Sequence, residues 1–224
     1  MTSAMESPRE RALEHCQACA LPVSHCICPY RCVQPSPSVA LWLLQHPQEM
    51  TKPTNTGRLI TDLVPNARRF RWHRLEPDPG LKTLLESPRY QPMVVFPTDD
   101  PRHEARKVSD WRRSCDRTPA LILLDGTWQQ AGKMFRLTRY LQALPVLSVA
   151  PAQASRYQLR RNGGPGRLCT AEIGAELLRH AGDVHTAQVL DAYFEAFSHH
   201  YQAARNNHRP QGETAVMAWL RTLN

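Results

Sequence analysis

The stretch LILLDGTWQQAGKMFR, residues 121–136, decides the fold of this chain. Its apolar start has the length and composition of a buried strand, and the residues from Trp128 onward have the pattern of a helix. Gly126 permits a tight turn between the two. Thr127 can cap the helix, and Gln130, three residues later, completes the spacing of a capping box. The stretch therefore predicts a strand that delivers Asp125 to its carboxyl end, directly before a capped helix.

The alternation of strand and helix continues on both sides of this stretch. Apolar or alternating runs predict strands at 39–44, 68–73, 93–96, 120–124 and 146–149. Helical patterns are expected at 56–64, 81–86, 128–141, 171–180, 186–204 and 213–223. Strands separated by helices are typical of an α/β fold, a mostly parallel sheet covered by helices on both faces.

Polar residues follow three of the predicted strands. They lie at 45–47, 96–100 and 124–128. In an open parallel sheet the ligand binds beyond the carboxyl ends of the strands. The sequence therefore predicts a ligand site where these three segments meet.

Five of the seven cysteines fall between residues 16 and 32. A CxxC pair and a CxC pair are spaced as a tetrahedral zinc ion requires. Clustering without a secretory signal favours a metal over disulfides, although incidental or redox-active thiols remain an alternative. We predict a structural zinc site in a module of residues 1–34, which a Pro-rich joint separates from a main domain of residues 39–224. The predicted ligands are Cys16, Cys19, Cys26 and Cys28.

Composition narrows the class of partner. Lys and Arg number 28 and Asp and Glu 20, so the formal net charge is +8. This excess favours a polyanion such as RNA, although many basic proteins bind no nucleic acid. No apolar run approaches the ~18 residues of a membrane span, and the first residues lack the apolar core of a secretory signal. We expect a cytoplasmic protein with no membrane association, and no obligate protein partner is evident.

Two regions carry candidate RNA-binding residues. Lys133 and Arg136 are three apart and share one face of the predicted helix. The loop 157–170 contains three glycines, whose backbone amides can approach a ligand closely, although a solvated loop is the alternative. The full set of candidates is Arg58, Lys133, Arg136, Arg156, Arg160, Arg161 and Arg167.

The residues Asp125, Thr127, Trp128 and Ala131 match the pattern D-x-T-W-x-x-A. They resemble the signature of the DTW-domain family. Further resemblances occur in order along the chain: the CxxC and CxC head, QHPQE at 45–49, NTGR at 55–58, FPTD at 96–99 and LCTAE at 168–172. Cys169 stands where the family usually has serine.

The resemblance implies a fold and an activity. The family is related to SPOUT proteins, whose sheet ends in a trefoil knot that binds S-adenosylmethionine. Its tRNA-acting members transfer the 3-amino-3-carboxypropyl group to a uridine of the variable loop and release 5′-methylthioadenosine. S-adenosylmethionine is thus expected as co-substrate, zinc as metal and tRNA as partner.

Asp125 is then the candidate catalytic base for the proton on uridine N3, with Asp99 and Asp100 as competitors. It could instead hold the sulfonium, or only stabilise the turn. Trp128 could stack on adenine or on the target base, or simply pack in the core. The residues expected to contact S-adenosylmethionine are Pro97, Thr98, Asp125, Gly126, Thr127, Trp128, Leu168, Cys169 and Thr170.

Two other functions remain open at this point. A SPOUT-type RNA methyltransferase would use the same co-substrate and release S-adenosylhomocysteine. A zinc-containing RNA-binding module without catalysis would need no polar site at the strand ends.

Overall fold

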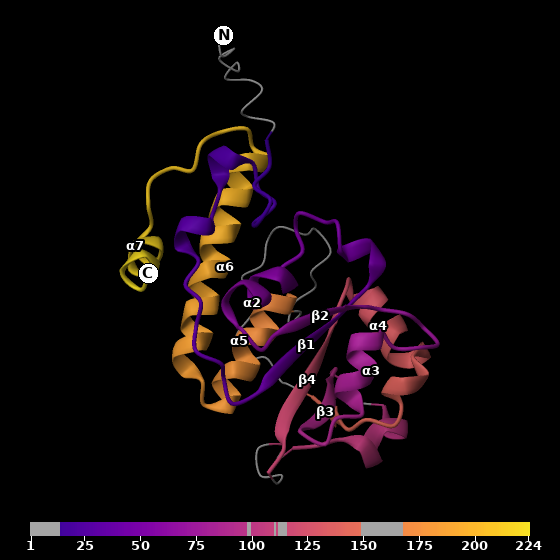
Figure 1. Cartoon of the computed structure of the whole chain (residues 1–224). Coiled ribbons are helices and arrows are strands. Elements are labelled where there is room, and N and C mark those ends of the chain that lie inside the picture. Colours follow the sequence, from indigo (N-terminus) through magenta and orange to yellow (C-terminus); the bar gives the residue numbers. More distant parts are fainter. Residues whose placement is uncertain (1–13, 98–99, 110, 112–115, 149–167) are drawn as a thin grey trace, which may run out of the picture.

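A computed structural model describes residues 14–97, 100–109, 111, 116–148 and 168–224. Its centre is a five-stranded sheet in the order β2-β1-β4-β3-β5 (Figure 1). All the strand pairs in the described residues are parallel. The strands are β1 (Ala40–Gln45), β2 (Arg68–Arg71), β3 (Tyr90–Val95), β4 (Thr118–Asp125) and β5 (Val146–Leu147). This confirms the predicted α/β class with a mostly parallel sheet.

Successive side chains of a strand point to opposite faces, and both faces are buried here. In β1, Leu41 and Leu43 belong to one core cluster, whereas Trp42 and Leu44 belong to another. The first cluster is covered by α2 (Gly57–Leu63), α5 (Thr170–Ala181) and α6 (Val184–Arg205). The second is covered by α3 (Pro79–Leu85) and α4 (Trp128–Leu137). The predicted helices on both faces are therefore present.

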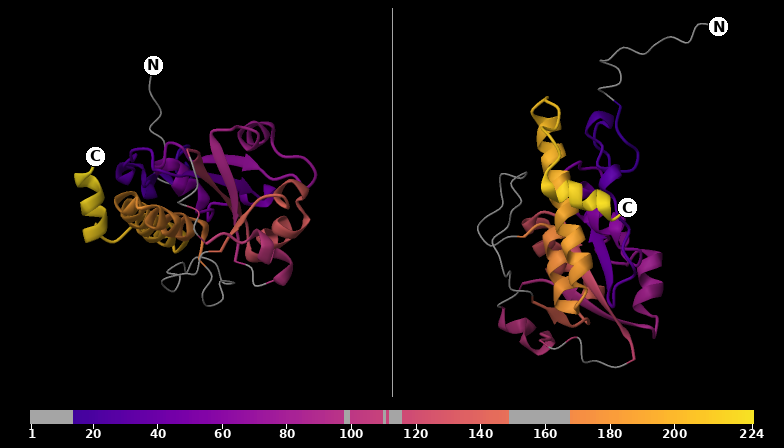
Figure 2. Two further views of the ribbon diagram at one scale, coloured as in Figure 1. Left: turned by 90° about the horizontal axis from the view of Figure 1, so that it is seen from below. Right: turned by 90° about the vertical axis from the view of Figure 1, so that its left-hand side faces the viewer.

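The cysteine-rich segment packs against the C-terminal helices. Its 3-10 turns, η1 (Val23–His25) and η2 (Cys28–Tyr30), contact α6 and α7 (Ala215–Thr222), respectively. Leu21 and Ile27 are completely buried in the same core cluster as α5 and α6. Figure 2 shows α7 outside α6, on the side away from the sheet. The boundary predicted between residues 34 and 39 stays a prediction.

The helix predicted at 128–141 ends earlier than the sequence indicates. Thr138 leaves the helical conformation, with φ −89° and ψ 108°, and a short 3-10 turn, η5 (Arg139–Leu141), follows. The Thr138 hydroxyl donates to the carbonyl of Met134 at 2.6 Å and accepts from Trp72 Nε1 at 2.8 Å. Trp72 is distant in sequence, so this helix end depends on a tertiary contact. The hydrophobic periodicity of the sequence cannot predict such a contact.

Two predictions fall outside the described residues. The trefoil knot depends on the path of the chain between β5 and α5, which includes residues 149–167. The candidate RNA-binding residues Arg156, Arg160, Arg161 and Arg167 lie in the same segment. Among the described helices, including η3 (Pro47–Glu49) and η4 (Pro101–Arg106), we find none with the length and apolarity of a bilayer span.

Trp42 provides a test of the core. It is 1% exposed and packs edge-on against Tyr90, with ring centroids 5.2 Å apart. Trp42→Ala should lower the free energy of unfolding by about 3–5 kcal/mol through lost burial and an unfilled cavity, measured by denaturant unfolding. Leu75→Ala is the matched control, because Leu75 is 67% exposed and its truncation should change stability by no more than ~0.5 kcal/mol. Equal effects in the two variants would contradict this arrangement of the core.

Candidate functional site

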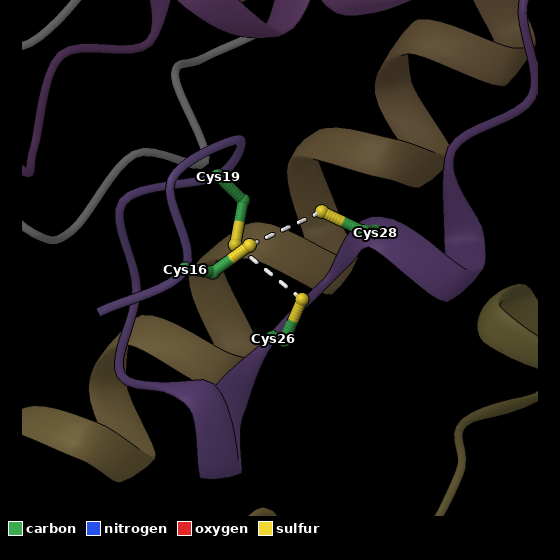
Figure 3. A group of neighbouring side chains, drawn as sticks. All are labelled: Cys16, Cys19, Cys26 and Cys28. Atoms are coloured by element: carbon green, nitrogen blue, oxygen red, sulfur yellow. Dashed lines mark hydrogen bonds between the residues drawn. The ribbon is translucent and has the colours of Figure 1, made fainter. Parts of the chain in front are cut away.

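The four predicted metal ligands come together (Figure 3). The Sγ atoms of Cys16, Cys19, Cys26 and Cys28 all lie within 4.8 Å of one another. The Cys16–Cys28 separation is 3.6 Å and the Cys19–Cys26 separation 3.7 Å. These sulfurs are too far apart for disulfides, which need about 2.05 Å. They match the edge of about 3.8 Å expected for a tetrahedron with zinc–sulfur bonds of about 2.3 Å.

The surroundings act differently on the four thiols: burial raises the pKa of Cys26 and Cys28, whereas the pKa of Cys16 is lowered. The backbone N–H of Cys19 lowers the pKa of Cys16 to about 6, against the effect of burial. A thiolate is the form of cysteine that binds a metal. The donor set and its geometry therefore fit a metal with four sulfur ligands.

A second site lies where β1 and β4 end side by side. Gln45 and Asp125 are direct partners in the register of these strands. The chain leaves β1 toward α2 on one face of the sheet and leaves β4 toward α4 on the other. In open parallel sheets, a ligand site forms at such a point, where neighbouring strands send their connections to opposite faces.

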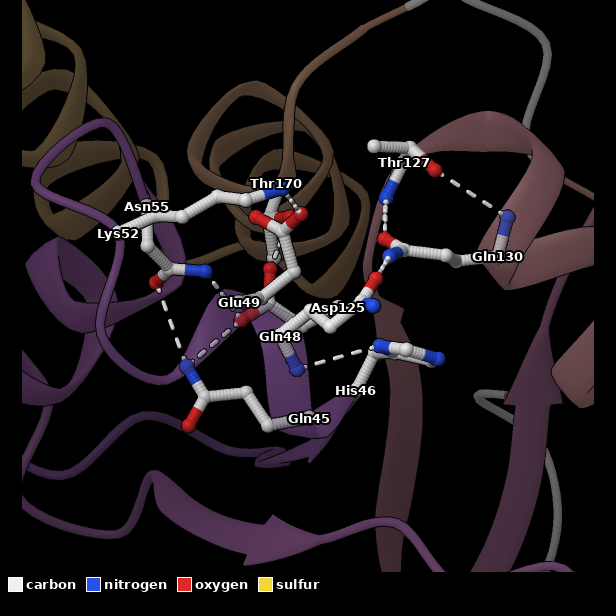
Figure 4. A network of polar contacts seen from close by, with 10 residues as sticks. All are labelled: Gln45, His46, Gln48, Glu49, Lys52, Asn55, Asp125, Thr127, Gln130 and Thr170. Atoms are coloured by element: carbon white, nitrogen blue, oxygen red, sulfur yellow. Dashed lines mark hydrogen bonds and ion pairs between the residues drawn. The ribbon is translucent and has the colours of Figure 1, made fainter.

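Asp125 lies at the centre of this site and is only 2% exposed. Its Oδ2 accepts hydrogen bonds from Gln45 Nε2 at 2.9 Å and from Asn55 Nδ2 at 2.8 Å (Figure 4). Its Oδ1 accepts one from Thr170 Oγ1 at 2.7 Å. One carboxylate thus joins the end of β1, the loop before α2 and the first turn of α5.

Burial raises the pKa of Asp125, whereas the three donors oppose this shift and the negative charge of Glu49 reinforces it. An aspartate at the protein surface has a pKa near 3.9 and is a poor base for a proton that leaves with difficulty. A raised pKa brings the carboxylate closer to the range in which it accepts a proton at neutral pH.

Glu49 places a second carboxylate in this region, with no exposed surface. Its Oε1 lies 2.6 Å from Lys52 Nζ. Sequence reasoning did not assign roles to Gln45, Glu49, Lys52 or Asn55. For Gln45, Glu49 and Asn55 the available signal was their position in the QHPQE and NTGR stretches that resemble family motifs, whereas Lys52 lies between these stretches.

Gly57 is required for the close approach of α2 to the carboxylate. A Cβ atom at this position would lie 2.7 Å from Asp125 Oδ2 and 2.7 Å from Leu43 Cδ2. No larger residue fits without displacing the carboxylate or the strand.

The turn after β4 confirms the predicted capping box. Thr127 N donates to Gln130 Oε1 at 2.7 Å, and Gln130 N donates to Thr127 Oγ1 at 3.3 Å. Gln130 Nε2 also donates to Gln48 Oε1 at 2.8 Å, which ties the start of α4 to the turn after β1. Trp128 is half-buried. Gly126, Thr127 and Trp128 therefore lie beside Asp125 at the strand ends.

Residues 168–170 reach the same place from the far end of the chain. Cys169 is the N-cap of α5, and its N–H donates to Glu172 Oε2 at 2.8 Å. Burial raises the pKa of the Cys169 thiol, so this residue is neutral at physiological pH. Ala171 N donates to Thr56 Oγ1 at 3.3 Å. Of the remaining candidates, Pro97 is exposed after β3 and Thr98 lies outside the described residues.

Of the two competing carboxylates, only Asp100 lies in the described part of the chain. Asp100 pairs with Arg102 at 2.5 Å, and this arginine holds the pKa of the Asp100 carboxyl well below its usual range. Asp99 lies outside the described residues. Of the two considered aspartates that lie in the described part of the chain, Asp125 is the one found in the network at the ends of β1 and β4.

The described basic candidates divide into two kinds. Lys133 and Arg136 are exposed on α4. Arg58 is only 8% exposed, and its guanidinium lies over the ring of Phe197, 5.1 Å from the centroid. Arg58 was expected to contact RNA, but this placement directs it into the protein interior.

Comparisons with known proteins agree with these motifs. A model of the DTW domain matches residues 13–202. Proteins named tRNA-uridine aminocarboxypropyltransferase 2 are similar: that of Drosophila melanogaster is 28% identical over 176 residues, 73% of this chain and 64% of the relative. That of Macaca fascicularis is 27% identical over 180 residues, 76% of this chain and 57% of the relative. That of Mus musculus is 27% identical over 172 residues, 73% of this chain and 55% of the relative.

The matches therefore span between about half and two thirds of these curated relatives. The search of solved structures gave no significant match. The family model covers most of the chain, including the cysteine cluster and every residue of the Asp125 network. The chain belongs to the DTW-domain family.

Proposed function

We propose that this protein transfers the 3-amino-3-carboxypropyl group from S-adenosylmethionine to N3 of a variable-loop uridine in tRNA. The observation that carries the proposal is the buried Asp125 network, built from the family's motif residues at the carboxyl ends of β1 and β4. The names of the similar proteins supply the reaction and the class of substrate. A methyltransferase remains an outcome of the test below.

In this reaction uridine N3 attacks the γ-carbon of the methionine portion. A nitrogen–carbon bond forms, the carbon–sulfur bond breaks, and 5′-methylthioadenosine leaves with the bonding electrons. The N3 proton must pass to a base. The sulfonium activates three carbons, so the protein selects one by positioning.

Asp125 is the proposed base. Its pKa is raised by burial, and its three hydrogen bonds fix its orientation. Two of the donors engage Oδ2 and one engages Oδ1, which leaves Oδ1 with capacity for one further hydrogen bond. Uridine N3–H would occupy that position.

The residues proposed to hold S-adenosylmethionine surround this carboxylate. Trp128 would stack on a ring, and the positive end of the α5 dipole would face the methionine carboxylate. A neutral Cys169 adds no charge there. The proposed set is Pro97, Thr98, Gly126, Thr127, Trp128, Leu168, Cys169 and Thr170.

The proposed RNA contacts are Lys133, Arg136, Arg156, Arg160, Arg161 and Arg167. Arg58 is left out of this set because it is buried. A SPOUT-like trefoil knot and a cytoplasmic location, where thiols stay reduced, complete the proposal. The metal proposed for the cysteine cluster is zinc, in a structural role, because four protein ligands leave no open position for water.

Product analysis tests the reaction directly. The protein is incubated with S-adenosylmethionine and unmodified tRNA, and the products are identified by mass spectrometry. Aminocarboxypropyl-uridine together with 5′-methylthioadenosine is the expected pair. S-adenosylhomocysteine with a methylated base would replace the proposal by a methyltransferase, and no product with intact tRNA binding would favour a binding module.

Asp125→Asn tests the base. We expect kcat to fall by about 100-fold or more, because amide nitrogen and oxygen cannot take the N3 proton. Thr170→Val is the matched variant, since it removes one ~1 kcal/mol hydrogen bond to Asp125 and should cost about fivefold. Similar losses in the two variants would reduce Asp125 to a positioning role.

The pH profile separates the roles further. A base acts when deprotonated, and burial raises the pKa of Asp125, so activity should fall with decreasing pH at a value above the ordinary ~3.9. This acidic limb should be absent from the residual activity of Asp125→Asn. Its persistence in that variant would assign the limb to another group.

Zinc makes a separate prediction. The purified protein should contain about one equivalent of zinc, and thiol modification should release it, because the metal needs four thiolates. Elemental analysis and a chromophoric chelator measure both quantities. Protein prepared with zinc present throughout, yet free of metal, would contradict the assignment.

A further inference from the structure

The row of residues at the Asp125 site continues onto the edge strand β2. Gln45 is in register with Asp125 on one side and with Arg71 on the other. Side chains in register on neighbouring parallel strands point to the same face, so Arg71 leaves the sheet on the face that carries the Asp125 carboxylate. Arg69, two residues earlier and about 6.6 Å away along the strand, points to that face as well. A line of cations thus runs along β2 to the row of the proposed base.

These cations belong to an exposed basic strip, residues 68–74. The strip contains four arginines and no acidic residue. All four are exposed: Arg68, Arg69, Arg71 and Arg74. In the part of the chain that the structure describes, we find no hydrogen bond or ion pair made by their guanidinium groups. The strip therefore offers several positive charges to an anionic partner.

A stacked pair of aromatic rings lies where the strip meets the strand ends. The ring centroids of His46 and Trp72 are 5.4 Å apart, and the ring planes are inclined by 22°. The backbone N–H of His46 donates to Asp125 O at 2.9 Å. That of Trp72 donates to Gln45 O at 2.8 Å, and Trp72 Nε1 donates to Thr138 Oγ1 at 2.8 Å. Both rings are half-buried, so a fixed aromatic surface stays partly open to solvent.

The combination of exposed arginines and stacked rings indicates RNA as the occupant. Phosphates bind exposed arginines, and unpaired bases stack on aromatic side chains. An acidic protein segment could bind the arginines alone. RNA is the partner that uses both the charge and the rings.

We propose that β2 and the stacked rings form a docking surface over which tRNA reaches Asp125. Arg69 and Arg71 bind two phosphates of the tRNA backbone, and the His46–Trp72 pair stacks on an unpaired base. This inference rests on the proposed function for the identity of the substrate. It adds a contact surface on the β2 side of the site to the RNA contacts proposed on α4.

The salt dependence of tRNA binding tests the arginines. The affinity of the full chain for unmodified tRNA is measured over a range of salt concentrations without S-adenosylmethionine, so that no reaction alters the RNA. Arg69→Gln/Arg71→Gln removes two phosphate contacts and should make the slope of log Kd against log salt shallower by about 1.4–1.8. Arg69→Lys/Arg71→Lys keeps both charges and should retain a slope within about 0.5 of wild type.

Arg89→Gln/Arg117→Gln is the matched control. These two exposed arginines directly precede β3 and β4, at the opposite end of the sheet from Asp125, and their loss changes the net charge by the same amount. The slope of this variant should stay within about 0.5 of wild type. Equal changes of slope in the two Gln variants would overturn the proposal. An unchanged slope in Arg69→Gln/Arg71→Gln would do the same and leave the strip to an acidic protein partner.

Substitutions of His46 test the stacking. Burial lowers the pKa of His46, so its ring is neutral at physiological pH and its loss removes no charge. His46→Ala should weaken tRNA binding by about 5- to 100-fold with the salt slope of the wild type, because one base loses its stacking surface. His46→Phe keeps a ring and should bind within about threefold of wild type. Equal affinities of His46→Ala and the wild type would overturn the stacking role.

The wild type separates this inference from the proposed function. Absence of salt-dependent tRNA binding in the wild type would overturn both. Formation of aminocarboxypropyl-uridine by the wild type, together with an unchanged salt slope in Arg69→Gln/Arg71→Gln, would overturn only the docking surface.

Discussion

The hydrogen bonds to the Asp125 carboxylate are the constraint on which the rest of the site depends. A buried carboxylate is tolerated only when its oxygens have partners, and leaving one buried polar group unsatisfied costs about 1–3 kcal/mol. Gln45, Asn55 and Thr170 provide these partners from three segments far apart in sequence. The need to satisfy one carboxylate therefore specifies how β1, α2 and α5 meet at the end of β4.

The position of the carboxylate also constrains the neighbouring residues at the start of α2. Gly57 is fixed by the space between α2, Leu43 and the carboxylate. Thr56, its neighbour, accepts the N–H of Ala171 and so aligns the start of α5 with the start of α2. Each residue of the NTGR stretch thus has its own role. Asn55 donates to the carboxylate and Thr56 accepts from α5. Gly57 allows the close approach of α2, and Arg58 is a buried cation.

The sequence predicted those features that depend on local pattern. The capping box of Thr127 and Gln130 lies within four residues, and the buried runs of β1 and β4 are visible as apolar segments, so both were accessible. The meeting of the strand ends at Gln45 and Asp125 was predicted, because parallel strands end at the same edge of a sheet. The approach of Thr170 to Asp125 depends on helix packing and does not follow from spacing. Arg58 was named as a candidate RNA contact but is buried, and the helix end at Thr138 depends on the distant Trp72.

The position of β2 at the edge of the sheet has a consequence for solubility. An edge strand offers unpaired backbone groups to which another chain can add by strand pairing, a common start of aggregation. Three of the four β2 residues, Arg68, Arg69 and Arg71, are exposed cations, and Phe70 alone faces the core. Two copies approaching edge to edge would bring six positive charges together. Repulsion between these charges disfavours strand pairing between two copies at this edge.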